Sequence, residues 1–415
     1  MVACAPHAGD GRRQLDSDAQ AYVRLVLALG ERDPDSLDSY FGAPAWRAQA
    51  HAEYKPLAEI QRAARESIAT LKRPRYGGPR DEEARRDFLE RQLRALVARI
   101  DVLTGVRRPF AGESRLLFDV DPPAPDRSRI DTARAALDRR VPGRGDLTRR
   151  VAEFQRRFVV PPGRLGAAFT RALAECRAVT LRHIALPADE RVEVAYVADS
   201  PWTAFTRYLG DHRSRITINS AIAFTVDEVL DLACHEGYPG HHVIGILVDD
   251  ALVRREGREE LSVQPLFSPQ ALLAEGTASV APRLAFSDAD RLRFERSTLA
   301  ETAGVEARDL DVAIEVERLL DAFSSLSADI AGRYADGMLE FARAAAALEQ
   351  EALMPFPDPL LKFVNEFRSY AVAYARGPEL ASAYLDAHAG SPHAEARWQA
   401  YVQLVTNAEQ AFPQK

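Results

Sequence analysis

The segment Cys234–Val243, with the sequence CHEGYPGHHV, places a proline in an otherwise helical stretch, and no other feature limits the fold as tightly. Thr225 and Glu228 match the pattern of a capping box, so a helix is expected to start there and to run through His235. Pro239 has no N–H to donate to the carbonyl of His235, and its ring clashes with that carbonyl at a cost of about 3 kcal/mol. The helix must therefore deform directly after His235.

Most of the remaining chain shows apolar residues at three-to-four spacing, which is typical of amphipathic helices. The clearest stretches are residues 19–33, 81–105, 146–159 and 271–286. Alternating residues at 191–197 and 214–220 predict two strands joined by an irregular connection, and residues 257–270 are expected to form a loop. The sequence therefore predicts a mainly α fold, large and helical, with a small β element before the helix that carries the motif.

The chain is expected to form one continuous unit with three parts. These are an N-terminal extension (1–18), a helical part that walls a cleft (19–190) and a part that carries the motif (191–415). The formal net charge is −7 and the basic residues are spread among acids, so no basic stripe indicates a nucleic-acid partner. No segment offers about 18 consecutive apolar residues, which argues against a membrane partner.

The three cysteines, Cys4, Cys176 and Cys234, show no paired spacing. We therefore expect no disulfide, a reducing compartment and a cytoplasmic location. Cys234 is interpreted as a small buried apolar residue rather than as a nucleophile or a ligand.

Three of the nine histidines lie within eight residues, at His235, His241 and His242, beside Glu236. Imidazole and carboxylate together suit Zn²⁺, and a catalytic zinc site has three protein ligands and one open position. Glu275 is the natural third ligand, because it is a single acid in an apolar helix, where an unpaired charge would cost several kcal/mol. We expect one Zn²⁺ at His235, His241 and Glu275, with iron as the alternative, since two histidines and a carboxylate also bind non-haem iron.

Helix geometry bears on the choice of the second ligand. On a straight helix His241 would lie about 240° round from His235, while His242 would share its face but lie about 10.5 Å along the axis. A wide bulge of two extra residues would bring His241 to the place of the fourth residue after His235. His242 is then either the alternative ligand or a substrate contact. The remaining alternative is a histidine cluster without a function, on a kink at the surface.

Four further residues are candidates for catalysis or substrate binding. Glu236 follows a ligand but points elsewhere on the helix, so it can take a proton from water as the general base. Tyr374 is either a hydrogen-bond donor to a tetrahedral oxyanion or a packing tyrosine. Arg376 can bind a substrate carboxylate or lie at the surface. Tyr208, like the nearby His212, precedes the motif and can line the cleft.

The stretch HEGYPGHH, followed by LLAEGTASVA, resembles the bacterial domain-of-unknown-function family 885. Members of that family carry an H-E-x-x-P-G-H-H helix, then an E-G-W-A-type helix, and near the C-terminus a stretch ending in S-Y-K-x-G. The first element matches in full over residues 235–242. The second matches at Glu275, with Thr277 in place of the usual tryptophan, and the third keeps Tyr374, with Ala375 in place of the lysine.

This resemblance implies a helical fold similar to the zinc peptidases of the gluzincin type. It also implies that His235, His241 and Glu275 are the ligands, Glu236 the base and Tyr374 an electrophilic helper. We therefore expect a zinc-dependent hydrolase that cleaves an amide bond in a small peptide or an aminoacyl-type conjugate. The alternatives are a non-hydrolytic metalloenzyme of the non-haem iron type on the same scaffold, and a catalytically silent binding protein.

Overall fold

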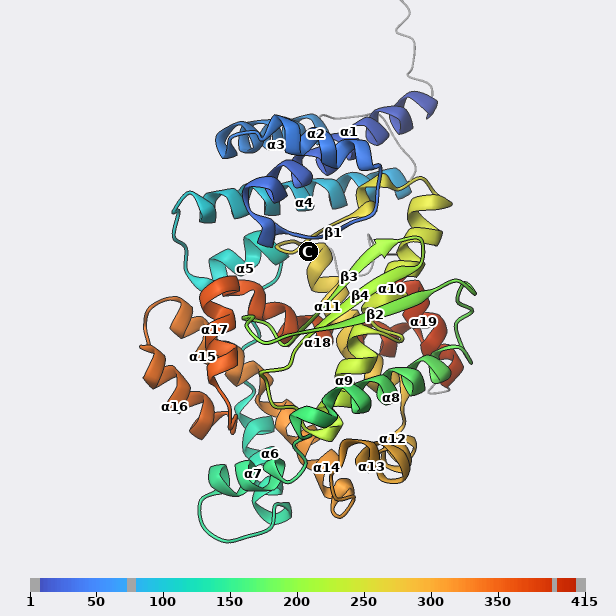
Figure 1. Ribbon diagram of the computed structural model, residues 1–415. Coiled ribbons are helices and arrows are strands. Elements are labelled where there is room, and N and C mark those ends of the chain that lie inside the picture. The colour runs from blue at the N-terminus through green and yellow to red at the C-terminus, as the bar shows by residue number, and fades with distance from the viewer. Residues whose placement is uncertain (1–7, 73–79, 390–393, 408–415) are drawn as a thin grey trace, which may run out of the picture.

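The computed structural model describes residues 8–72, 80–389 and 394–407, and most of them lie in helices (Figure 1). The helices before the central sheet are α1 (Ala8–Arg32), α2 (Pro44–Glu53), α3 (Leu57–Leu71), α4 (Arg80–Leu103), α5 (Phe110–Phe118), α6 (Arg127–Arg140), α7 (Leu147–Arg156) and α8 (Pro162–Thr180). Those after it are α9 (Val226–Glu236), α10 (His241–Leu247), α11 (Pro269–Ala285), α12 (Asp288–Phe294), α13 (Ala300–Ala303), α14 (Leu310–Leu320), α15 (Ser324–Ala335), α16 (Phe341–Glu351), α17 (Asp358–Phe367), α18 (Ala371–His388) and α19 (Ala394–Thr406). Short 3-10 or π helices are η1 (Pro34–Ser36), η2 (Val248–Arg254), η3 (Glu259–Ser262), η4 (Glu295–Leu299), η5 (Asp321–Phe323) and η6 (Arg368–Tyr370). The predicted mainly α fold is confirmed.

A three-stranded sheet lies directly before the motif and crosses the middle of the molecule in Figure 1. Its strands are β2 (Arg191–Val197), β3 (Ala204–Gly210) and β4 (Arg213–Asn219), in the order β2–β4–β3. β2 and β4 run parallel, whereas β3 and β4 are antiparallel. The predicted strands correspond to β2 and β4, but the irregular connection predicted between them is wrong. Thr206 and Tyr208 are buried and alternate with exposed residues, which is the pattern of a half-buried strand.

A second, two-stranded sheet joins distant parts of the chain. β1 (Leu37–Tyr40) pairs antiparallel with β5 (Val263–Pro265), so that Tyr40 lies opposite Val263. The loop predicted for residues 257–270 is therefore wrong where β5 forms. This pairing brings β1 from the N-terminal helices to the segment that precedes α11.

One large hydrophobic core runs from the first helix to the last. Leu15 in α1, Phe169 in α8 and Tyr401 in α19 all belong to it, and each is 2% exposed or less. The two large parts expected from the sequence therefore pack as one unit. Over its described residues, the expected extension 1–18 is not separate, because α1 already starts at Ala8 and Leu15 is in the core.

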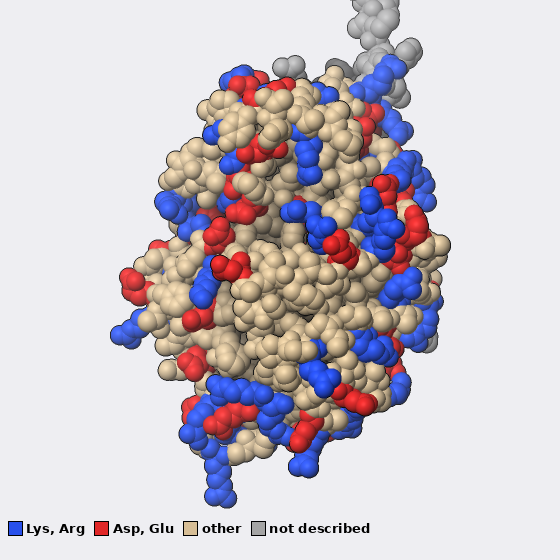
Figure 2. Space-filling view, viewed as in Figure 1, with Lys and Arg blue, Asp and Glu red and all other residues tan. Residues whose placement is uncertain are grey.

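Basic and acidic side chains are interspersed over the face seen in Figure 2, with no field of a single sign. Basic and acidic side chains also pair between distant segments of the chain, for example Arg157 with Asp309 at 2.7 Å and Arg296 with Asp311 at 2.8 Å. This face carries no basic stripe of the kind that binds nucleic acid. Within the described ranges, no helix combines the length and the apolar character needed to cross a bilayer.

Candidate metal centre

The motif lies at a break between two helices. α9 ends at Glu236 and α10 begins at His241, and the residues between them are not helical. The predicted capping box at the start of α9 is present. The wide bulge predicted within one continuous helix is wrong: Pro239 cannot continue the hydrogen-bond ladder, and the N–H of Gly240 instead reaches the carbonyl of Cys234 at 2.9 Å. The chain closes a tight loop and starts a new helix.

Gly240 is required by this loop. A Cβ at this position would lie 1.8 Å from the carbonyl oxygen of His235 and 2.4 Å from that of Cys234. The loop is also held from outside, since the Tyr401 hydroxyl of α19 donates to the carbonyl of Pro239 at 2.8 Å. A side chain at position 240 would push the start of α10 away from the end of α9.

The break brings three predicted ligands together. His235 Nε2 lies 3.5 Å from Glu275 Oε2, and His241 Nε2 lies 3.6 Å from Glu275 Oε1. One ligand atom from each residue lies within 4.8 Å of the other two. A tetrahedral ion with bonds of about 2.1 Å would hold neighbouring ligand atoms roughly 3.4 Å apart. The two distances to Glu275 are close to this value, so these three side chains could hold a metal ion.

Glu275 has a buried carboxylate oxygen without a hydrogen bond, and the His235 imidazole lies 3.5 Å from it. Its Oε2 makes no hydrogen bond to any described residue, whereas its Oε1 accepts one from the buried Tyr370 hydroxyl at 2.8 Å. A buried acceptor without a partner is costly, and a cation would satisfy it. Tyr370 fixes the orientation of the carboxylate, as second-sphere groups do in metal sites.

A contact between two glycines sets the position of Tyr370 beside Glu275. A Cβ on Gly276 of α11 would lie 2.4 Å from the carbonyl oxygen of Gly377, and a Cβ on Gly377 of α18 would lie 2.9 Å from the Cα of Gly276. The backbones of α11 and α18 therefore touch. Because both positions are glycine, η6 and α18 can bring their tyrosines against the ligand helix.

Electrostatics at the three side chains favour positive charge between them. Burial alone would raise the pKa of Glu275, but the nearby imidazoles of His241 and His235 hold it well below its usual value. Burial lowers the pKa of His241, yet the negative charge of Glu275 in particular outweighs burial, and the pKa is raised to about 9. The carboxylate thus stabilises a cation at this place.

Glu236 is buried next to the ligands but is not one of them. The Thr206 hydroxyl of β3 donates to its Oε2 at 2.6 Å and lies 3.1 Å from its backbone oxygen. The negative charge of Glu236 acts on both His241 and Tyr374. Its carboxylate is therefore held on the same side as the ligands, which suits a general base.

A small cavity opens beside His241. β1 contributes Asp38 to its lining, β3 contributes Thr206 and Tyr208, and α11 contributes Gln270. Burial raises the pKa of Asp38 to about 7, and the charges of nearby groups modify this shift. In Figure 2 the surface is hollowed between the N-terminal helices and the three-stranded sheet.

The structure gives different positions to the two candidate residues of α18, Tyr374 and Arg376. Tyr374 is 46% exposed, its ring centroid lies 5.7 Å from that of Tyr370, and the charges of Glu275 and Glu236 act on its phenol. Tyr374 is therefore placed beside the ligands. Arg376 instead pairs at the surface with Glu379 at 2.6 Å, which corresponds to the surface alternative.

His242 does not face the ligands. It is fully buried, with Nδ1 2.8 Å from the Ser214 hydroxyl and Nε2 2.9 Å from Glu190. The Tyr238 hydroxyl also donates to Glu190, at 2.6 Å, and Arg177 pairs with it at 2.6 Å. Because both ring nitrogens are already bonded, the prediction that His242 is an alternative ligand or a substrate contact is not met.

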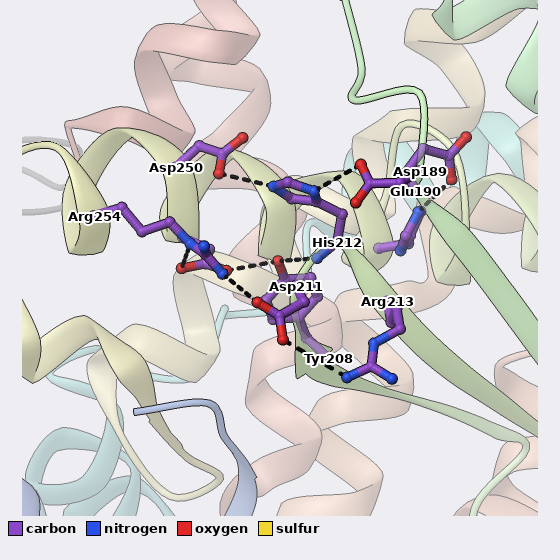
Figure 3. Close-up of polar contacts among 10 residues, drawn as sticks. Asp189, Glu190, Tyr208, Asp211, His212, Arg213, Asp250 and Arg254 are labelled. Atoms are coloured by element: carbon purple, nitrogen blue, oxygen red, sulfur yellow. Dashed lines mark hydrogen bonds and ion pairs between the residues drawn. The ribbon is translucent and has the colours of Figure 1, made fainter. Parts of the chain in front are cut away.

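Tyr208 is on the buried face of β3, and His212 lies in the turn that follows β3. Figure 3 shows both residues among acidic side chains. The Tyr208 hydroxyl donates to Asp249 at 2.9 Å, so only its buried ring lines the cavity. His212 lies between Asp189 and Asp250, and the hydrogen bond to Asp250 in particular raises its pKa. Tyr208 is a packing residue at the cavity wall rather than a polar contact for substrate.

The expectation for the cysteines is wrong. Cys176 of α8 and Cys234 of α9 form a disulfide, with their Cα atoms 5.5 Å apart. The two residues are separated by 58 positions, so spacing along the chain gave no signal. The argument for a reducing compartment therefore loses its support. Cys4 lies outside the described residues.

Comparisons with known proteins give a fold relationship. No family model matches the chain, and no curated protein matches it significantly. The crystal structure of a protein from Colwellia psychrerythraea, described as a lipoprotein, is similar with a TM-score of 0.50 and 12% sequence identity. The similarity covers 87% of this chain and 69% of that chain. At such low identity it supports the fold alone, and the resemblance to family 885 stays a prediction.

Sequence reasoning missed four polar residues around the centre. They are Asp38, Thr206, Gln270 and Tyr370. Each comes from a different element, and none has a motif of its own. The one available signal was Tyr370, which stands four residues before Tyr374 and so shares a helical face with it.

Proposed function

We propose that this protein is a zinc-dependent hydrolase that cleaves an amide bond in a small peptide or an aminoacyl-type conjugate. The observation that carries the proposal is the spacing of His235, His241 and Glu275, together with the buried Oε2 of Glu275, which makes no hydrogen bond within the described residues. The resemblance of HEGYPGHH to family 885 supports the same assignment. The proposal keeps Glu236 as the general base and Tyr374 as an electrophilic group.

The residues around the centre divide the chemistry between them. A bound Zn²⁺ would supply Lewis-acid polarisation of the scissile carbonyl. Glu236, oriented by Thr206, accepts the proton of the attacking water and delivers it to the leaving nitrogen. Tyr374 donates a hydrogen bond to the carbonyl oxygen as negative charge develops on it. Tyr370 keeps the Glu275 carboxylate in the orientation that holds the ion.

The proposal is tested by metal analysis and turnover in the parent and in Glu236→Gln. The matched control is Glu349→Gln, which makes the same change at an exposed position of α16. We expect zinc in all three proteins, and a fall in the turnover of dipeptides or aminoacyl amides of about 10²–10⁴-fold in Glu236→Gln alone. The His235→Ala variant should lose both zinc and turnover.

Other outcomes contradict specific parts of the proposal. Loss of zinc from Glu236→Gln would mean that base and ligand are misassigned. Iron in the purified protein, with oxygen-dependent turnover, would favour the non-haem iron alternative. A protein that holds no metal and keeps its ligand-binding properties in His235→Ala would be a binding protein.

A further inference from the structure

We propose that Asp38 and Gln270 form a recognition site for a free ammonium group beside the metal centre. The substrates would then be amides in which an unblocked α-amino group lies next to the scissile bond, as in an unmodified peptide N-terminus. This inference rests on the proposed function and names its substrate class.

Two acceptor atoms line the cavity beside His241 without partners. Asp38 Oδ1 and Gln270 Oε1 are both buried, and neither has a hydrogen bond to a described residue. The Gln270 amide nitrogen donates to the carbonyl of Val263 at 3.3 Å, so the amide oxygen is the atom left unbonded. The cavity therefore offers acceptors that only a donor can satisfy.

The charge of the cavity selects an ammonium among possible donors. Glu236 and Glu275 together balance one divalent ion, and Asp38 adds a third carboxyl to the same cavity. The charge of Arg207 acts on Asp38, but its Nε donates to the backbone carbonyl of Asp38 at 3.1 Å, and Oδ1 of the carboxyl has no hydrogen bond within the described residues. An ammonium carries three donors and one positive charge, whereas a substrate carboxylate would be repelled here.

The position of Asp38 indicates a short distance between the amino group and the scissile carbonyl. Asp38 is outside the group of ligand atoms that lie within 4.8 Å of one another, yet it lines the same small cavity as His241. Pairing of β1 with β5 brings it there, and the Ser39 hydroxyl bonds to Gln264 at 2.6 Å across that pair. An α-amino group, one carbon away from its carbonyl, would then lie at Asp38 when that carbonyl lies at the ligands.

The test compares two zinc-binding inhibitors that differ only at the amine. An amino-acid hydroxamate with a free amine and its N-acetylated counterpart are titrated calorimetrically into zinc-loaded protein. The proteins are the parent, Asp38→Asn, Gln270→Met and the control Asp35→Asn, which makes the same change at an exposed residue of η1. Zinc content and a melting curve are recorded for each protein.

We expect the parent and Asp35→Asn to bind the free amine roughly tenfold or more tightly than the acetylated compound. Asp38→Asn and Gln270→Met should reduce this ratio, with the larger loss in Asp38→Asn, and should leave the affinity for the acetylated compound unchanged. Equal affinities in the parent would overturn the inference while leaving the proposed function intact. So would a preference that survives in both variants. Failure of the parent to bind either compound would remove the proposed function, and the inference with it.

Discussion

Two histidines that are adjacent in the sequence, His241 and His242, each face a glutamate, and the two pairs differ in their bonding. His241 Nε2 lies 3.6 Å from Glu275, and that glutamate keeps a buried oxygen without a hydrogen bond. His242 Nε2 lies 2.9 Å from Glu190, and two other side chains complete the bonding of that carboxylate. The first pair leaves room for an ion between its members, whereas the second is a closed hydrogen-bonded network.

Residue type alone does not distinguish a candidate metal site from a structural cluster. Both clusters combine imidazole, carboxylate and a tyrosine hydroxyl, and the glutamate of each is buried. The clusters differ in the distance between the imidazole nitrogen and the carboxylate oxygen. They also differ in whether every buried polar atom already has a hydrogen-bond partner. Four measurements test this difference.

The largest effect is expected from removing each histidine in turn. His241→Ala should lose zinc and turnover, because only two ligands remain. His242→Ala should keep zinc in the folded fraction, since its ring bonds Ser214 and Glu190 and not the ion. Zinc content per folded protein is the measurement. The comparison fails if His242→Ala loses more zinc than His241→Ala does.

Stability should respond in the opposite order. His242→Ala leaves a cavity and removes one partner of the buried Glu190, so we expect the free energy of unfolding to fall by about 2–5 kcal/mol. His51→Ala, at a side chain that is 79% exposed, is the control and should change little. Urea unfolding of the metal-free proteins measures this. A loss as small as that of the control would mean that the network around Glu190 contributes little.

A smaller effect is expected at the hydroxyl that orients Glu275. Tyr370→Phe removes the 2.8 Å hydrogen bond to Oε1 and should weaken zinc binding about 10–100-fold. Tyr374→Phe is the matched control, and it should lower turnover while leaving zinc affinity unchanged. Competition with a chelating dye gives both affinities. Equal affinities in the two variants would separate Tyr370 from the metal site.

The smallest expected effect is a pH dependence of stability that comes from the hydrogen-bonded network around Glu190. Burial raises the pKa of Glu190, but hydrogen bonds from His242, Tyr238 and Arg177 outweigh burial and lower it to about 2. A carboxyl with a lowered pKa in the folded state stabilises the protein above its unfolded value of about 4.5, and this stability is lost as the pH falls towards 2. Melting temperatures of the parent should therefore fall on acidification more steeply than those of Glu190→Gln. Parallel curves would contradict the assignment.

Much of the candidate site could be predicted from the sequence because its residues lie in one short motif and one isolated acid. His235 and His241 had to be brought together by the chain break at Pro239, and Glu275 needed a cation in its apolar helix. The mode of that break could not be derived, because the fit of Gly240 against backbone carbonyls is a tertiary contact. The choice between His241 and His242 likewise depended on Glu190, which no local pattern connects to the motif.

The residues that were missed come from elements paired over long distances. Asp38 reaches the cavity because β1 pairs with β5. Thr206 reaches it on β3, a strand where the sequence predicts an irregular connection. The Cys176–Cys234 bond joins two helices whose packing fixes it. Helical periodicity reports which face of an element is buried but not which elements meet, so these contacts were out of its reach.

The meeting point of Gly276 and Gly377 has a consequence for any survey of tolerated substitutions. Neither residue has a side chain to contribute, yet even an alanine at either position would force α11 and α18 apart. The helix that carries Glu275 would then shift relative to Tyr370 and Tyr374 together. In a saturation scan scored by turnover, these two positions should tolerate substitution as poorly as the ligands do. From that scan alone, two glycines that only set the distance between helices would be mistaken for catalytic residues.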